Sequence, residues 1–140
     1  MGAFTEDLMK SLDSTRPVNE VLEDKSTFLI TQSLSEALAS LLQKKGLSRA
    51  QVIRNASLNT IYGHQIFSGS RTPSRNKLLA IAFGMNLDLE ETNLLLKQQG
   101  YPQLYPRIER DAMIIYGFLH KLSLLDTNTM LYENNQETLI

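Results

Sequence analysis

The residues with the clearest chemical meaning in this chain are seven lysines and arginines in the middle of the sequence. Residues 37–87 contain these seven cations and no acid, whereas residues 1–36 carry seven acids against three bases and residues 88–140 carry eight against four. The cations are Lys44, Lys45, Arg49, Arg54, Arg71, Arg75 and Lys77. The net charge of the whole chain is only −1, although its charges are unevenly distributed along the sequence. The basic block is typical of a surface that binds a polyanion, and the alternative is a solvated face that balances two acidic flanks.

Residue types that support catalysis are sparse. The chain has no cysteine and two histidines, which leaves no thiolate nucleophile and little scope for a catalytic triad. The acidic pairs Glu90-Glu91 and Glu109 with Asp111 fall at expected helix starts, where carboxylates stabilise the helix dipole. His64 has no second metal ligand three or four residues away. We therefore expect no enzyme, no cofactor and no metal.

Length and hydropathy favour one globular domain with a small appendage. A chain of 140 residues can bury a core without disulfides. The longest apolar stretches, such as residues 112–119, are much shorter than a membrane span, and the first residues lack a signal-peptide pattern. We expect a cytoplasmic protein with no membrane partner.

Helix signals recur along the chain and strand signals hardly appear. Capping pairs occur at Ser33 with Glu36, Ser48 with Gln51, Asp88 with Glu91 and Ser123 with Asp126, and Pro17 suits a first helical position. Gly46, Gly69 and Gly100 stand where helices should stop. The pattern predicts an all-α fold, with helices near residues 5–13, 17–25, 34–45, 49–56, 60–67, 75–84, 89–99, 107–120 and 124–133.

The basic block coincides with a more specific arrangement. Leu47-Ser48 leads into a short helix, which is followed by the turn Ser57-Leu58-Asn59 and a second short helix closed by Gly69-Ser70-Arg71-Thr72-Pro73. This spacing resembles the helix-turn-helix of the lambda-repressor-like (Cro and CI type, XRE) DNA-binding family over residues 34–91. The resemblance implies a lambda-repressor-like core, sequence-dependent binding of double-stranded DNA, and a role in transcription regulation with residues 60–67 in the major groove.

The same resemblance assigns roles to individual residues. Base reading would begin at Thr60 and Ile61 and continue with His64 and Gln65, which lie outward on the expected helix. The DNA backbone would be contacted by Arg49, Ser68 and Arg71, with further phosphate contacts from Arg75 and Lys77. The core of the motif would consist of Val52, Ile53, Leu58, Gly63, Ile66 and Phe67.

Two positions depart from the family pattern. Ile53 stands where the second helix usually has a small residue, and Gly63 stands where the third helix usually has a branched one. In the family these positions face one another across the helix crossing. We interpret the pair as a compensated exchange that conserves volume. Ser57 occupies the turn position that is usually glycine.

The rest of the chain is divided into flanking segments. We expect an acidic N-terminal helical arm at residues 1–32, the DNA-binding domain at 33–100, and a helical extension on the same core at 101–140. Residues 87–105 align with residues 122–140 at an offset of 35, with matching leucines, a matching Thr-Asn pair and Phe83 matching Phe118. This predicts a helix pair used twice, against the alternative of chance similarity between leucine-rich helices.

The partners expected from this organisation go beyond DNA. A homodimer is compatible with the resemblance, because related repressors often read palindromes. The acidic N- or C-terminal helices offer a surface for a protein partner. The alternative function is a helical protein-interaction adaptor that has lost DNA base recognition, for which Ile61, Gly63 and the acidic flanks are the motivating features.

Overall fold

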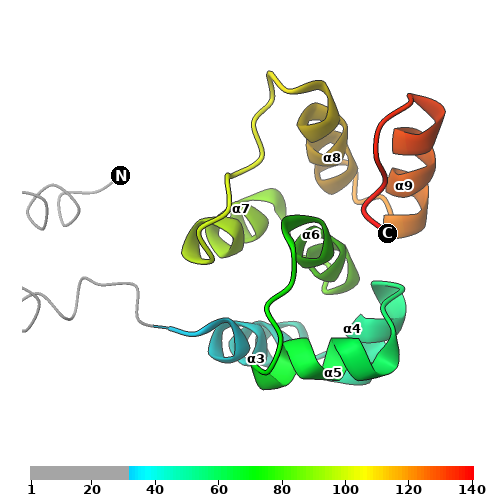
Figure 1. Cartoon of the computed structure of the whole chain (residues 1–140). Helices are drawn as coiled ribbons and strands as arrows, with labels where there is room; N and C mark the ends of the chain where they lie inside the picture. Colours follow the sequence, from blue (N-terminus) through cyan, green and yellow to red (C-terminus); the bar gives the residue numbers. More distant parts are fainter. Residues whose placement is uncertain (1–31) are drawn as a thin grey trace, which may run out of the picture. The chain divides into compact units, whose positions relative to one another are not determined.

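The computed structural model describes residues 32–140, and over this range the chain forms seven α-helices and no strand (Figure 1). The helices are α3 (Leu34–Lys45), α4 (Arg49–Asn55), α5 (Thr60–Ser68), α6 (Arg75–Gly84), α7 (Leu89–Gln98), α8 (Glu109–Leu119) and α9 (Leu124–Glu133). The predicted all-α class is confirmed for this range, and the predicted helix ends agree to within two residues. The helices expected at residues 5–13 and 17–25 lie outside the described residues.

The helix ends follow from local side-chain chemistry. The hydroxyls of Ser33, Ser48 and Ser123 each accept a hydrogen bond from the amide three residues on. Ser48 with Gln51 and Asp88 with Glu91 form complete capping boxes, in which both residues satisfy amides that the helix leaves unpaired. The predicted caps within the described range are confirmed. No described helix is long and apolar enough to cross a bilayer.

A single cluster of buried apolar side chains runs from Ala37 to Leu139, and α6 lies at its centre. All residues from Leu78 to Gly84 are buried, because α4, α7 and α9 each pack against this helix (Figure 1). The contact with α4 is close: a Cβ atom on Gly84 would lie 2.9 Å from the carbonyl oxygen of Val52. Glycine at this position lets the two helix backbones approach each other.

The helix pair α6–α7 and the segment after it recur in α8–α9 and the C-terminal segment. Asn93 Oδ1 accepts from the Leu104 amide at 2.9 Å, and 35 residues later Asn128 Oδ1 accepts from the Leu139 amide at 2.8 Å. The preceding threonines, Thr92 and Thr127, are buried and donate to the carbonyl four residues back. The predicted repeat is confirmed by these shared contacts.

The backbone repeats along with the side chains. Asn86 and Lys121 have φ of 57° and 54°, and Gly100 and Asn135 have φ of 77° and 59°, so the two left-handed residues that follow α6 and α7 each have a counterpart 35 residues on. The repeated unit includes α6, which means that residues 101–105 continue the first unit rather than beginning the second. We call residues 75–105 the first repeat and residues 110–140 the second repeat.

The two repeats contact each other through equivalent residues. The rings of Phe83 and Phe118 stack with centroids 4.0 Å apart. Arg75 donates to Asp111, while its counterpart Arg110 donates to Asn76, which is the counterpart of Asp111. In the same way α6 packs against α9 and α7 against α8. This exchange of roles is what an approximate two-fold relation between the repeats produces.

Candidate nucleic-acid interface

The helices α4 and α5 are joined by a short turn whose backbone is fixed by its own residues. The Leu58 amide donates to the Ile53 carbonyl at 3.1 Å, and Asn59 caps α5 by accepting from the Tyr62 amide at 3.1 Å. Ser57 has φ of 54°, in the left-handed region that favours glycine. A serine therefore adopts the conformation for which glycine is the more common choice.

Gly63 lies where α5 crosses α4, directly beneath the side chain of Ile53. A Cβ atom on Gly63 would lie 2.7 Å from Ile53 Cγ1 and 2.9 Å from both Cδ1 and Cγ2. Contacts this short do not occur between carbon atoms, so Ile53 fills the volume that a side chain on Gly63 would occupy. This geometry supports the interpretation of the pair as a compensated exchange.

The inner face of α5 packs into the core of the motif. Ile66 and Phe67 are buried, as are Val52 and Ile53 on α4, while Leu58 and Tyr62 are partly buried against the same cluster. A core position for Phe67 agrees with the sequence-based expectation. One side of α5 is thereby fixed against the rest of the domain.

The outer face of α5 carries the side chains expected to read bases. Thr60, Ile61 and His64 are exposed, and Ile61 keeps 70% of its surface accessible. Gln65 is half-buried, and its Oε1 accepts from Arg71 Nε at 3.1 Å. Ser68 is exposed and donates to the Gln65 carbonyl at 3.1 Å. The structure therefore brings the predicted base-reading residues onto one continuous face.

Two arginines flank this face, each above an aromatic ring. The guanidinium of Arg49 lies 5.9 Å from the centroid of Phe67, and that of Arg71 lies 5.8 Å from the centroid of Tyr62. Such stacking restricts the side chains while leaving their N–H groups available. The role of Tyr62 as a platform was missed by sequence reasoning, because stacking depends on how the loop after α5 folds back.

Three cations of the basic block form ion pairs with two acids elsewhere in the domain. Lys44 Nζ and Lys45 Nζ each lie 2.9 Å from a carboxylate oxygen of Glu91, and Arg75 pairs with Asp111. Within residues 32–140, Arg49, Arg54, Arg71 and Lys77 form no ion pair. The cations left without an acid in this range therefore include the two arginines that flank α5.

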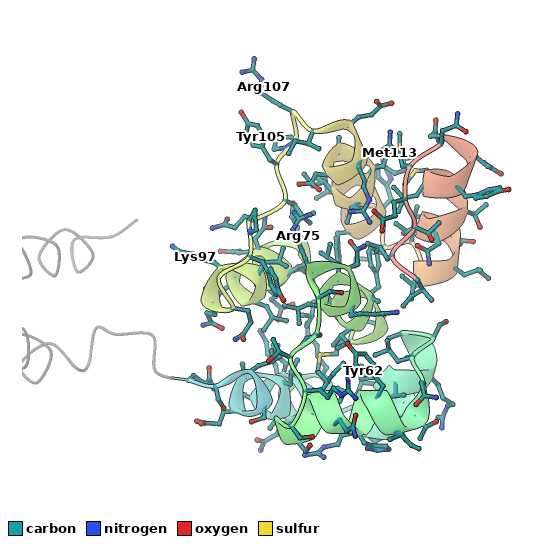
Figure 2. The ribbon with its side chains drawn as sticks, viewed as in Figure 1. Tyr62, Arg75, Lys97, Tyr105, Arg107 and Met113 are labelled. Atoms are coloured by element: carbon teal, nitrogen blue, oxygen red, sulfur yellow. The ribbon has the colours of Figure 1, made fainter. Side chains whose placement is uncertain are left out.

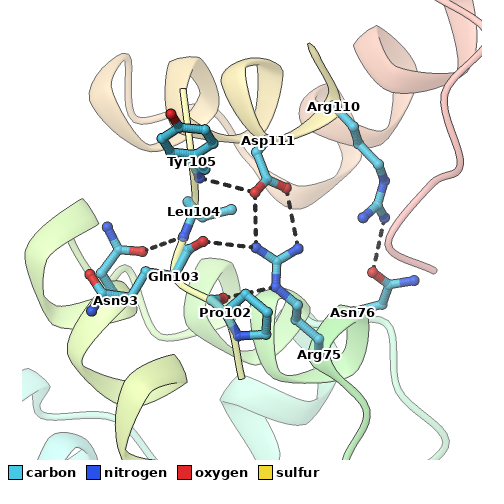
Figure 3. A network of polar contacts seen from close by, with 9 residues as sticks. All are labelled: Arg75, Asn76, Asn93, Pro102, Gln103, Leu104, Tyr105, Arg110 and Asp111. Carbon is cyan, nitrogen blue, oxygen red and sulfur yellow. Dashed lines mark hydrogen bonds and ion pairs between the residues drawn. The ribbon is translucent and has the colours of Figure 1, made fainter. Parts of the chain in front are cut away.

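The position of Arg75 corrects the phosphate contact that the sequence suggested for it. Its Nη1 and Nη2 bind the Asp111 carboxylate at 3.2 and 3.0 Å, and Nε donates to the Pro102 carbonyl at 3.0 Å (Figure 3). Nη2 also lies 3.4 Å from the Gln103 carbonyl. These partners take four of the five guanidinium N–H donors and pair the charge with Asp111, so Arg75 joins the two repeats instead of presenting an unpaired cation to a phosphate. No local pattern signals this pairing, because Asp111 lies 36 residues away.

The Glu91 carboxylate links α7 to the end of α3. Partial burial acts to raise its pKa, but hydrogen bonds from Lys44, the Asp88 amide and Lys45, with the charge of Lys45, outweigh this and hold the pKa of Glu91 at about 2. The same contact raises the pKa of Lys44. The ionised pair thus stabilises the packing of α3 on α7.

This pKa predicts how stability depends on pH. Because the folded-state pKa of Glu91 lies below its value in the unfolded chain, its contribution is complete above about pH 4.5 and is lost as pH falls toward 2. Solvent screening reduces the effect to on the order of 1 kcal/mol. Between pH 6 and pH 3 the free energy of unfolding should fall less for Glu91→Gln than for the wild type. Urea denaturation followed by circular dichroism measures it. An equal loss in both proteins would contradict the assignment.

Residues 32–140 contain no group of three histidine, cysteine or acidic side chains that could hold a metal ion. Comparison with known proteins adds no further assignment: no protein-family model, no curated protein and no solved structure matches this chain.

Proposed function

We propose that the outer face of α5, with Arg49 and Arg71 beside it, binds double-stranded DNA in a sequence-dependent manner and that the protein regulates transcription. The observation that carries the proposal is the two-sided construction of α5. Its inner face is fixed by buried Ile66 and Phe67, and its outer face presents polar and apolar side chains between two arginines that have no acidic partner in residues 32–140. The major groove admits one helix presented in this way.

Each part of the face has a distinct role in this proposal. Arg49 and Arg71 bind phosphates and so orient the domain, and Ser68 can add a neutral contact. Thr60, His64 and Gln65 hydrogen-bond to base edges, and Ile61 contacts a thymine methyl group. The hydrogen bond from Arg71 to Gln65 couples the two roles, since the amide is oriented by the same arginine that contacts the backbone.

A second candidate function is a protein-interaction adaptor. The observation in its favour is Ile61, an aliphatic side chain in the first turn of α5 with 70% of its surface exposed. An exposed isoleucine suits a protein partner as well as a thymine methyl group. The two functions differ in how they respond to salt and to charge reversal.

DNA selection and charge reversal test the proposal directly. Selection from random duplexes at physiological salt should yield one enriched sequence, and affinity for it should fall steeply with salt as counterions are released. Arg49→Glu and Arg71→Glu should each lower affinity by about tenfold or more and reduce the salt slope, since each removes a phosphate contact. Lys97→Glu is the matched control, because Lys97 is exposed on α7 away from α5 (Figure 2).

Two results would contradict sequence-dependent DNA binding through the outer face of α5. One is the recovery of no enriched sequence together with no binding to random duplexes. The other is equal loss of affinity in Lys97→Glu and Arg71→Glu, which would indicate a general charge effect rather than a defined face. Circular dichroism of each variant checks that the helical fold is retained.

A further inference from the structure

The arginine that follows α5 is bound to Gln65 through both its backbone and its side chain. The Arg71 amide donates to the Gln65 carbonyl at 3.2 Å, and Arg71 Nε donates to Gln65 Oε1 at 3.1 Å. The guanidinium also lies 5.8 Å from the centroid of the Tyr62 ring. Three contacts of different kinds therefore hold the guanidinium of Arg71 beside the side-chain amide of Gln65.

The loop that carries Arg71 is itself attached to the last turn of α5. Gly69 ends the helix with a φ of 88° and turns the chain back along it. The Ser70 amide then donates to the Gln65 carbonyl at 3.0 Å, the same oxygen that accepts from the Arg71 amide. The position of Arg71 is thereby fixed relative to the outer face of α5.

The bond from Arg71 decides which way the Gln65 amide points. A guanidinium carries five N–H donors and no acceptor, so only the oxygen of the amide can bond to it. The amide nitrogen is turned away from the arginine and forms no hydrogen bond within residues 32–140. Since no buried side-chain nitrogen in this range lacks a partner, that nitrogen is accessible to solvent. Gln65 therefore offers two N–H donors to a ligand.

The free side of this pair carries donors and a positive charge. Arg71 is exposed, and its Nη1 and Nη2 form no hydrogen bond within the described part of the chain. Oε1 of Gln65 keeps a second lone pair, but it lies next to the guanidinium cation. An incoming N–H donor would meet that positive charge, whereas an incoming acceptor would be attracted to it.

One base edge in the major groove consists of acceptors alone. Guanine presents N7 and O6, both acceptors, whereas adenine places an amine donor beside N7 and cytosine presents an amine donor. Thymine presents a single acceptor beside its methyl group. A side chain that offers only donors, with a cation beside it, matches the guanine edge best.

We propose that Gln65 reads a guanine and that Arg71 is the positioning residue that gives it this preference. The inference rests on the DNA binding proposed above and adds the identity of one base. Arg71 holds the amide through Nε while its terminal nitrogens remain free for a phosphate. Arg49 lies over Phe67 but bonds to no base-reading side chain within residues 32–140, so it contributes charge without orienting a reader.

Selection of random duplexes by the full chain and its variants tests the assignment. Gln65→Ala identifies the base pair that residue 65 reads, as the position at which the preference disappears. The wild type should select guanine at that position. Gln65→Glu should select cytosine there instead, because its carboxylate can accept from both Arg71 and the cytosine amine.

Two matched arginine variants separate positioning from charge. Arg71→Ala should lower the preference for guanine over adenine at that position by about tenfold, because the released amide can turn to pair with N7 and the amine of adenine. Arg49→Ala is the control, since it removes the other arginine that lies over an aromatic ring. It should lower affinity for the duplex and leave every base preference unchanged.

The possible failures of this inference and of DNA binding are distinguishable. Selection of another base at the position read by residue 65 would overturn the guanine assignment while leaving DNA binding intact. The same base preferences in Arg71→Ala as in the wild type would show that Arg71 does not position Gln65. Enrichment of no sequence by the wild type would contradict the proposed function, and this inference with it.

Discussion

Arg75→Ala is expected to lower the free energy of unfolding by about 3–5 kcal/mol, the range measured when one partner of a buried ion pair is removed. The Asp111 carboxylate, whose residue is only 3% exposed, would keep a single partner, the Tyr105 amide at 3.0 Å. The carbonyls of Pro102 and Gln103 would also lose their donor. Urea denaturation followed by circular dichroism measures the loss, which is a large fraction of the stability of an ordinary domain.

The repeat supplies the control for this experiment. Arg110 is the counterpart of Arg75 and donates to the Glu137 carbonyl and to Asn76 Oδ1, but it has no carboxylate partner within residues 32–140. Arg110→Ala should therefore cost less, about 1.5–3 kcal/mol, as expected for a hydrogen bond from a charged group that leaves no buried carboxylate unpaired. Equal losses in the two variants would show that the buried carboxylate does not set the cost. Arg75→Met with Asp111→Leu should recover most of the stability, because the double variant leaves no unpaired charge.

Gly63→Val and Ile53→Ala are each expected to destabilise the domain, and the double variant should be more stable than the sum of the two losses predicts. A Val side chain at residue 63 would overlap Ile53, at a cost of about 1–3 kcal/mol. Ile53→Ala would open a cavity in the core, at a cost of about 2–5 kcal/mol. In the double variant the new valine occupies the space that the isoleucine leaves, which gives a coupling of about 1–3 kcal/mol.

A second glycine distinguishes specific compensation from a general effect. A Cβ atom on Gly117 would lie 2.7 Å from Thr127 Oγ1, so Gly117→Ala is also expected to destabilise the protein. Gly117 and Ile53 share no contact partner among these short distances. The losses from Gly117→Ala and Ile53→Ala should therefore add. Additive losses for the Gly63 and Ile53 pair as well would contradict the compensated exchange.

The features of the described region that could be predicted from the sequence are those that depend on residues close together in the chain. Ser48 with Gln51 and Asp88 with Glu91 marked helix starts correctly, because a capping side chain reaches only an amide three residues away. Gly46, Gly69 and Gly100 marked the stops, because each takes a positive φ that glycine adopts without steric cost. The helical spacing of apolar residues then predicted the all-α class. The outward position of Thr60, Ile61 and His64 followed from the same periodicity.

The internal repeat was visible in the sequence only as matching residue types. The roles of its Thr-Asn pair were not, because Asn93 and Asn128 accept from amides 11 residues further on. Those bonds form only when the segment after each helix pair folds back along it. Because these bonds recur at equivalent positions, the similarity between the two segments is structural and does not rest on matching leucines alone.

Which cations of the basic block have an acidic partner depends on how the helices pack. No acid stands near the seven bases in the sequence, yet Lys44 and Lys45 pair with Glu91, and Arg75 pairs with Asp111. These acids lie 36 to 47 residues away, and helix packing brings each pair within hydrogen-bonding distance. Local patterns fix helices because their interactions are short in sequence. The partner of a charge depends on how complete helices pack, and no local pattern encodes that.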